Sequence, residues 1–270
     1  MSYANILVAL DRGAAARDRV RLAGDLARRF GALLTGVAAR RIPGPIAVND
    51  IHEAQAIYAK EEADLANELA EVRDVFEHNG GEVEMAWHSA ADSPSTLVVE
   101  KARAADLVVL GLRGPADGDP GDMAVLPGPV LMEVGRPVLV VPSGIAALNA
   151  ARVVVAWKDT PETRRAVSGA LPLIKRAEQV FVATVGADAR IEGAEEVTGH
   201  LARHGARAEP QLLPRPSLSE IGEILRFAEA QRADLVVMGA YGHSRLREWI
   251  FGGATRDILQ TTPICCLLSH

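Results

Sequence analysis

The chain has 270 residues, which is enough for two medium domains or one large one, each with a buried core. Hydrophobic residues make up 49% and charged residues 24%, as in ordinary globular proteins. The net charge of −6 argues against nucleic acid as a partner. The sequence has no apolar run of about 18 residues and no basic leader followed by an apolar stretch, so we expect a cytoplasmic protein without a membrane partner.

Apolar runs in the first half predict strands, and helical patterns lie between them. Continuous runs rich in β-branched residues are typical of strands that are covered on both faces of a parallel sheet. The predicted strands span residues 4–10, 33–39, 82–88, 106–111 and 137–142. The predicted helices span residues 17–30, 53–78, 94–105 and 126–134. The second helix has one apolar stripe, formed by Leu65, Leu69, Val72 and Phe76, and should end at Gly80-Gly81.

The second half repeats this order of elements. Residues 105–111 (ADLVVLG) are echoed by residues 233–239 (ADLVVMG), and similar pairs of apolar runs lie on either side of them. The predicted strands span residues 152–157, 179–185, 206–213, 234–239 and 263–268. Thr160 followed by Pro161 predicts a helix start, and the stretch from Ser217 to Glu220 predicts a capping box. Each half is therefore expected to be an α/β unit, with the boundary near residues 142–144.

The segment with the strongest functional signal begins at Gly239, directly after a predicted strand. Glycine at a strand end lets backbone amides approach an anion, and glycines before a helix expose its unpaired N–H groups to phosphate. The glycines of this segment are Gly239, Gly242, Gly252 and Gly253, and its charged residues are Arg245, Arg247, Glu248 and Arg256. Three arginines against one acid, in an acidic protein, favour a phosphate site over a set of tight turns.

This segment resembles the signature of the universal stress protein family: a glycine, two residues, a glycine, nine residues, a glycine, then Ser or Thr. Gly239, Gly242 and Gly252 match these spacings. The resemblance extends over both halves. It implies an α/β fold of two tandem open five-stranded parallel sheets, Rossmann-like, each with strand order 3-2-1-4-5. The implied domains are residues 1–143 and 150–270.

The resemblance also implies a ligand. In the family the glycines and the hydroxyl residue hold the triphosphate of ATP, so ATP or another adenine nucleotide, with Mg²⁺ as an accompanying ion, is expected in the second half. Here the hydroxyl position is Gly253, and Thr255 matches a second hydroxyl often found in the family. His243 and Arg245 lie in the same loop, where His243 is either a phosphate contact or a solvated side chain.

The family places an Asp at the end of the first strand, where it contacts the nucleoside. Asp11 matches this position in the first half, whereas Lys158 followed by Asp159 stands there in the second. Asp159 is either a carboxylate displaced by one place or a helix N-cap, and we favour the cap. Lys158 is expected to meet a phosphate or to pair with a nearby acid.

The first half has the opposite defect. Gly111 and Gly114 persist, but residues 115–122 (PADGDPGD) contain three acids and two prolines, and this loop should repel a triphosphate. Gly128 stands at the wrong spacing, between two prolines. The second half therefore retains the phosphate part of the signature, and the first half is expected to be degenerate.

Other candidate sites have less support. His200 and His204 are four residues apart but lack a third metal ligand, so we interpret them as solvated residues near a helix end. Cys265 and Cys266 are adjacent in an apolar run and should point to opposite faces as buried residues rather than form a disulfide. No nucleophile with a base, and no catalytic pair of carboxylates, emerges from the spacing.

Three functional hypotheses follow. The first is a stress-response protein whose second half binds an adenine nucleotide as a ligand or signal. The second, based on the departures at Gly253 and Lys158, is a regulatory interaction module without a nucleotide. A slow ATPase ranks last because no general base is visible. The two halves should pair through their last strands, residues 137–142 and 263–268, and a further homodimer stays open.

Overall fold

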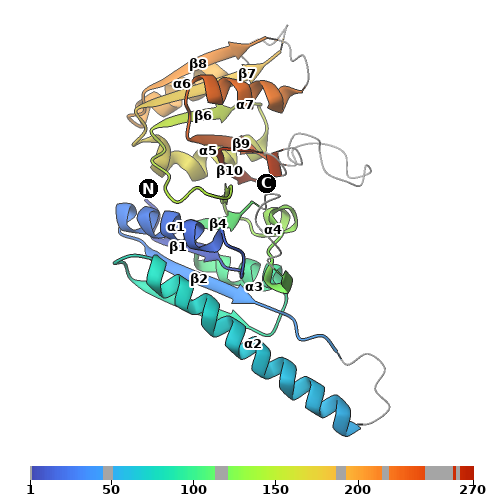
Figure 1. Ribbon diagram of the computed structural model, residues 1–270. Coiled ribbons are helices and arrows are strands. Elements are labelled where there is room, and N and C mark those ends of the chain that lie inside the picture. The colour runs from blue at the N-terminus through green and yellow to red at the C-terminus, as the bar shows by residue number, and fades with distance from the viewer. Residues whose placement is uncertain are drawn as a thin grey trace.

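The computed structural model describes residues 2–44, 51–112, 121–186, 193–214, 219–240, 258–259 and 262–270. Ten strands form one sheet in the described part of the chain (Figure 1). The strands are β1 (Asn5–Ala9), β2 (Leu33–Ala39), β3 (Met85–Ala90), β4 (Leu107–Gly111), β5 (Val138–Val141), β6 (Arg152–Ala156), β7 (Gln179–Val185), β8 (Ala208–Leu213), β9 (Leu235–Gly239) and β10 (Cys265–Ser269). The expected strands are thus present.

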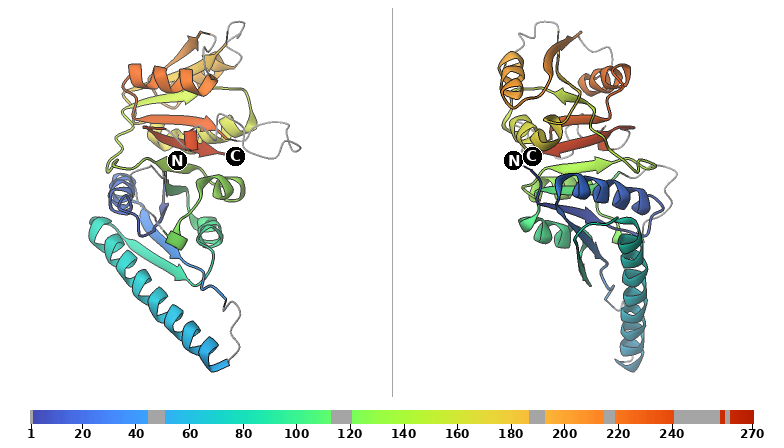
Figure 2. Two further views of the ribbon diagram at one scale, coloured as in Figure 1. Left: turned by 45° about the vertical axis from the view of Figure 1, so that its right-hand side comes forward. Right: turned by 90° about the vertical axis from the view of Figure 1, so that its left-hand side faces the viewer.

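Helices cover both faces of this sheet. They are α1 (Ala16–Phe30), α2 (Ile51–Asn79), α3 (Pro94–Lys101), α4 (Pro127–Glu133), α5 (Pro161–Ile174), α6 (Ala194–Arg203) and α7 (Glu220–Ala230), with short 3-10 helices η1 (Ala102–Ala104) and η2 (Gly121–Met123). One buried apolar cluster contains residues of α1, α2, α5 and α6, and the cluster on the opposite face contains residues of α3, α4 and α7. The molecule is therefore a three-layer α/β structure (Figure 2).

The strand order is β3-β2-β1-β4-β5-β10-β9-β6-β7-β8. Within each half all pairs are parallel and the order is 3-2-1-4-5, which confirms the expected topology. The halves join where β5 pairs antiparallel with β10, with Leu139 opposite Leu267. Both apolar clusters contain residues from the two halves, so on each face of the sheet the core is continuous across the two halves.

Burial along the strands follows their place in the sheet. The central strands β1, β4, β6 and β9 are almost entirely buried, as continuous apolar runs predict. The outermost strands β3 and β8 are only partly buried. Strand β8 also contains Glu209 and Pro210, residue types that discourage the pairing of an edge strand with another chain.

Two expected element starts needed correction. Strand β3 begins at Met85 rather than at residue 82, because Gly81, with a φ of 81°, and the bond from the Val83 N–H to the Gly81 carbonyl form a turn first. Helix α7 is capped by Ser219, whose Oγ accepts from the Gly222 N–H at 3.0 Å. Glu220 is therefore the first helical residue and not the distal member of a capping box, while Ser217 lies outside the described residues.

Other predicted features of the helices are confirmed. Thr160 caps α5, with its side chain accepting from the Thr163 N–H at 3.3 Å and a proline at the first helical position. In α2 the predicted stripe faces the core, and the helix ends at Asn79, just before Gly80. The first half of α2 projects beyond the sheet (Figure 1), and Ile51 there is 71% exposed. No helix in the described part of the chain is long and apolar enough to span a bilayer.

Candidate functional site

Each half has a topological switch point at the carboxyl edge of the sheet. Strand β1 lies between β2 and β4, and β6 lies between β7 and β9, so the chain leaves these neighbouring strands in opposite directions. In open α/β sheets such a divergence forms the crevice in which ligands bind. The register pairs Val8 with Val109 and Ala156 with Met238. This register brings Asp11 and Gly111 together at the carboxyl edge of the first half, and Lys158 and Gly239 together at that of the second. The two carboxyl edges lie at opposite ends of the sheet, because β5 and β10 are antiparallel.

Gly239 ends β9 in close contact with the first turn of α5. An ideal Cβ atom at Gly239 would lie 2.5 Å from the backbone nitrogen of Thr163 and 2.8 Å from its Oγ1. No side chain fits in this space, so glycine is required for the helix to approach the strand end. Thr160 and Thr163 are buried, and their hydroxyls lie 3.2 Å apart. The second crevice thus carries a helix N-terminus and two hydroxyls beside Gly239.

Lys158 and Asp159 follow β6 at the same edge, and both are exposed. Asp159 Oδ1 accepts hydrogen bonds from Arg164, from Nη2 at 2.5 Å and from Nε at 3.0 Å. The preferred prediction that Asp159 caps the helix is wrong, because Thr160 holds that position. The helix therefore starts one residue later than an Asp159 cap would require, and the carboxylate turns outward to Arg164.

The rest of the predicted phosphate loop lies outside the described residues. This applies to Gly242, His243, Arg245, Gly252, Gly253 and Thr255. Of the predicted second-half residues, the structure therefore brings Lys158, Asp159 and Gly239 to one edge, and the loop that contains the others starts there.

In the first half Asp11 is already held by the chain itself. Its Oδ1 accepts from the Gly13 N–H and its Oδ2 from Arg19 Nη2, both at 2.8 Å. Arg19 also donates from Nε to the Ala9 carbonyl at 2.9 Å, and its side chain is only 5% exposed. Both carboxylate oxygens of Asp11 are thus engaged inside the protein.

Sequence reasoning missed Arg19. An ideal Cβ atom at Gly111 would lie 2.1 Å from Arg19 Nη1, so the guanidinium fills the space beside the end of β4. The signal was available: Arg19 lies on α1 next to Ala16, Val20 and Ala23, which are all buried. A charged residue between core positions indicates an internal partner, because burial of an unpaired charge costs several kcal/mol.

A network of ion pairs lies beside Asp11, between β2 and α2. Arg40 contacts Glu61 at 3.0 Å and Glu68 at 2.8 Å, while Arg12 contacts Glu68 at 2.9 Å and Glu71 at 3.6 Å. Burial by itself lowers the pKa of Arg40, but the hydrogen bond and charge of Glu61 and the charge of Glu68 raise it above the usual value. The network fixes the outer part of α2 to the carboxyl end of β2.

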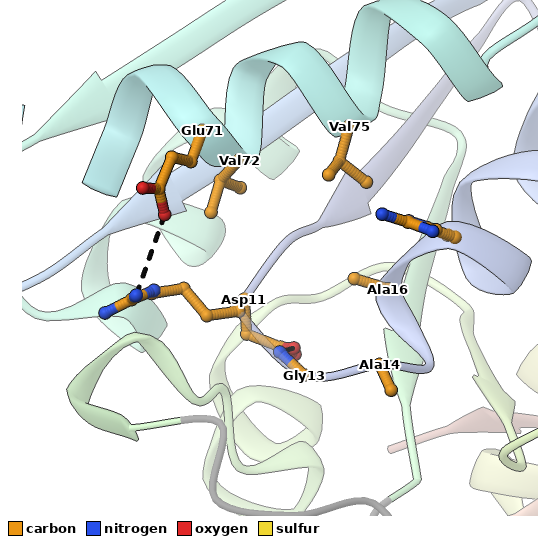
Figure 3. A pocket seen from close by; sticks show the side chains of 9 residues that line it. Asp11, Gly13, Ala14, Ala16, Glu71, Val72 and Val75 are labelled. Atoms are coloured by element: carbon orange, nitrogen blue, oxygen red, sulfur yellow. Dashed lines mark hydrogen bonds and ion pairs between the residues drawn. The ribbon is translucent and has the colours of Figure 1, made fainter. Parts of the chain in front are cut away.

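A pocket of about 430 Å³ opens between α1 and α2 next to this network (Figure 3). Its lining consists of Asp11, Arg12, Gly13, Ala14, Ala16, Arg17, Glu71, Val72 and Val75. Figure 3 shows Val72 and Val75 of α2 opposite Ala14 and Ala16. Arg12 and Glu71, which form an ion pair, also line the pocket. The pocket mixes both signs of charge, and its lining includes Asp11 and Gly13 at the end of β1.

The remaining candidates keep structural roles. Cys265 and Cys266 are both buried and unpaired, and they belong to clusters on opposite faces of the sheet, as expected. Burial raises the pKa of each thiol to about 12. The rings of His200 and His204 pack edge to face with centroids 4.7 Å apart. No group of three metal-ligating side chains is found in the part of the chain that the structure describes.

Two parallel five-stranded units, joined antiparallel so that their switch points lie at opposite edges of one sheet, define a tandem α/β protein of the kind that binds ligands beyond the strand ends. The model of the universal stress protein family matches residues 2–142 and 219–270, so the chain belongs to this family. A universal stress protein of Synechocystis sp. is 27% identical over 168 residues, 59% of this chain and 56% of that protein. The chain thus covers about half the length of this curated relative.

Solved structures show the same fold over nearly the whole chain. A universal stress protein from Archaeoglobus fulgidus DSM 4304 superposes with a TM-score of 0.70 at 15% identity, covering 98% of this chain and 97% of that one. A functionally unknown protein from Pseudomonas aeruginosa PAO1 superposes with a TM-score of 0.54 at 15% identity, covering 99% of this chain and 92% of that one. At these identities the likeness concerns the fold.

Proposed function

We propose that the protein is a stress-response protein that binds ATP or another adenine nucleotide in its second half, as a ligand or signal rather than as a fuel. The observation that carries this proposal is the position of Gly239. It ends β9 at the second switch point, against the first turn of α5, and it is the first residue of the family's glycine signature. Family membership supports the same ligand class.

The proposed phosphate contacts are backbone amides and cations. Gly239, Gly242, Gly252 and Gly253 would supply amides, Thr255 a hydroxyl, and His243 and Arg245 side-chain donors. Lys158 is exposed at the end of the neighbouring strand and would add a charge where the family has a carboxylate. This cation would offset the missing hydroxyl at Gly253. Mg²⁺, if bound, would share the phosphate charge.

The nucleoside would meet Asp159 rather than the usual aspartate position. Both hydrogen bonds from Arg164 reach the same oxygen of Asp159, Oδ1. The second oxygen would accept from a ribose hydroxyl. Arg164 would then hold the carboxylate in place, one residue beyond its place in other members of the family.

The domains that we infer are residues 1–143 and 150–270. The antiparallel pairing of β5 with β10 supports a paired arrangement of two related domains in one chain. In this arrangement each domain covers the apolar edge strand of the other, which removes an exposed edge that would otherwise aggregate.

The test is to denature freshly purified protein and to identify any released nucleotide by chromatography and mass. The wild type should release an adenine nucleotide, and a Gly252→Val, Gly253→Val double variant should release none, because the side chains block close approach of the backbone to phosphate. A Gly199→Ala variant, changed at an uncrowded helical glycine, is the matched control and should release as much as the wild type.

An empty wild type that also fails to bind added ATP at millimolar concentration would exclude the nucleotide proposal. The departures at Gly253 and Lys158 would then favour a regulatory interaction module without a nucleotide. Release of phosphate from ATP above the buffer background would instead favour a slow ATPase.

A further inference from the structure

The first-half crevice contains a cation that belongs to the chain. The Arg19 guanidinium bonds to the Ala9 carbonyl and to Asp11, and Nη1 occupies the space beside Gly111. It therefore bridges the carboxyl ends of β1 and β4, the two strands that form the switch point. A ligand in this crevice would have to displace a buried ion pair.

The segment that follows the acidic loop adds an apolar residue. Met123 in η2 is 1% exposed and is among the largest fully buried side chains. It belongs to the cluster on the α1 and α2 face, together with Leu10 and Ala38 near the ends of β1 and β2. The residues that follow it, Val130 and Leu131 of α4, belong to the opposite face. The chain therefore sends Met123 to the other side of the sheet before α4 begins.

The segment that contains Met123 also carries an acidic residue, Asp122, whose charge acts on Arg40. Burial lowers the pKa of Arg40 at the end of β2, but the hydrogen bond of Glu61, the charges of Glu68 and Glu61 and, last, the charge of Asp122 raise it above the usual value. Asp122 is exposed, and its charge is opposite to that of Arg40.

The second crevice is built differently. The groups beside Gly239 are the backbone nitrogen and hydroxyl of Thr163, whereas a guanidinium lies beside Gly111. The Thr163 N–H donates to the Thr160 cap, so what the second crevice offers an anion is the positive end of the α5 dipole. A buried arginine already paired with a carboxylate has no need of an anion. The two halves share a topology but differ in what stands at the strand end.

We infer that Arg19 and Met123 close the first-half crevice from within, so that the chain binds one nucleotide and not two. In this inference Arg19 occupies the polar groups of the crevice, and Met123 fills its apolar part. The number of nucleotides rests on the proposed function of the second half. The closed first crevice is a separate claim about the protein alone.

Thiol labelling tests the closed crevice directly. Native Cys265 and Cys266 are 1% and 0% exposed, so a Met123→Cys variant adds one thiol to an unreactive background. We expect this thiol to react at least tenfold more slowly with an aromatic disulfide reagent than the thiol of a Leu126→Cys control, because Leu126 is 61% exposed. Millimolar ATP should change neither rate. Fast labelling of Met123→Cys, or labelling that ATP accelerates, would overturn the inference.

Hydrogen exchange on the wild type covers the case in which Met123→Cys does not fold. Peptides over residues 9–20 and 121–126 should exchange at the same rate with and without ATP, while a peptide over residues 239–258 should be protected by ATP. Protection of the first two peptides would contradict a closed first crevice. If ATP protects no peptide, the proposed function fails, and the labelling rates of the two cysteine variants still decide whether the crevice is closed.

Discussion

At the scale of single residues, the pairing of Asp11 with Arg19 determines what the end of β1 can bind. Asp11 matches the family's nucleoside contact, but both of its carboxylate oxygens accept hydrogen bonds from within the chain. Its partner Arg19 is nearly buried. The position of Asp11 could be predicted from the strand end and the family signature. Its partner could not, because Arg19 lies eight residues away on a helix whose rotation against the sheet is set by packing.

Replacement of Arg19 by methionine should destabilise the protein by about 3 kcal/mol or more, since it leaves a partly buried carboxylate without its cation. Urea denaturation followed by circular dichroism measures the loss. The Arg19→Met, Asp11→Asn double variant should recover part of it, because no uncompensated charge remains. The control is Arg73→Met, which breaks the exposed pair of Arg73 with Glu77 and should cost less than about 0.5 kcal/mol. Equal losses in the two single variants would contradict a buried role for Arg19.

The two cysteines give a second prediction at this scale. Burial raises the pKa of both thiols to about 12, so neither should react with a thiol reagent at pH 8 until the protein is denatured. In the unfolded chain a thiol ionises near pH 8.5, so the folded state binds more protons above that pH. Stability should therefore fall as the pH rises from about 9 toward 12.

The fall should be smaller in a Cys265→Ala, Cys266→Ala variant, which lacks both groups. Urea denaturation of the two proteins at pH 8 and at pH 10 measures the difference. An equal loss of stability between these pH values in both proteins would show that the thiols do not contribute to it.

At the scale of elements, the strands were predictable to within three residues because each is a continuous apolar run between turn signals. The sequence-based predictions failed where the position of a residue depends on three-dimensional geometry rather than on the hydrophobic pattern. Ser219 caps α7, because its backbone is extended directly before the helix and its side chain accepts from the Gly222 N–H. Met123 directly follows the acidic stretch 115–122 in the sequence, yet it is buried against the sheet. Neither outcome can be derived from periodicity.

The contact of α1 with the end of α2 depends on a helical glycine. An ideal Cβ atom at Gly24 would lie 2.1 Å from the Gly80 carbonyl oxygen, whereas nothing lies within 4 Å of one at Gly199 in α6. We expect Gly24→Ala to destabilise the protein by about 2 kcal/mol through the clash, and Gly199→Ala to stabilise it by about 0.5–1 kcal/mol through helix propensity. Thermal denaturation of both variants tests the opposite signs, and stabilisation by Gly24→Ala would refute the close packing.

At the scale of the whole molecule, the two halves form one structural unit. Strands β5 and β10 join them in one sheet, the Tyr3 hydroxyl donates to the Gly169 carbonyl at 2.7 Å, and Arg176 stacks over Phe30 at 4.6 Å. The pairing of the last strands could be foreseen from their apolar edges. The contacts of Tyr3 and Arg176 could not be foreseen, because they depend on how the two halves align.

This continuity predicts cooperative unfolding. A variant that keeps only Trp87 reports on the first half, and one that keeps only Trp157 reports on the second. In each variant the fluorescence transition in urea should have the same midpoint, within error, as the circular dichroism transition of that variant. The reason is that the shared core couples the two halves. A first-half transition that clearly precedes the second would show that the interface between the halves is too weak to couple them.

The central claim, one nucleotide held by the second half, is tested most directly by a calorimetric titration of nucleotide-stripped protein with ATP. The account predicts a stoichiometry of one ATP per chain for the wild type and no binding by the Gly252→Val, Gly253→Val variant. Two ATP molecules per chain, or one that persists in the variant, would place a nucleotide in the first half and contradict the account. An absence of binding to the wild type would contradict the nucleotide function altogether.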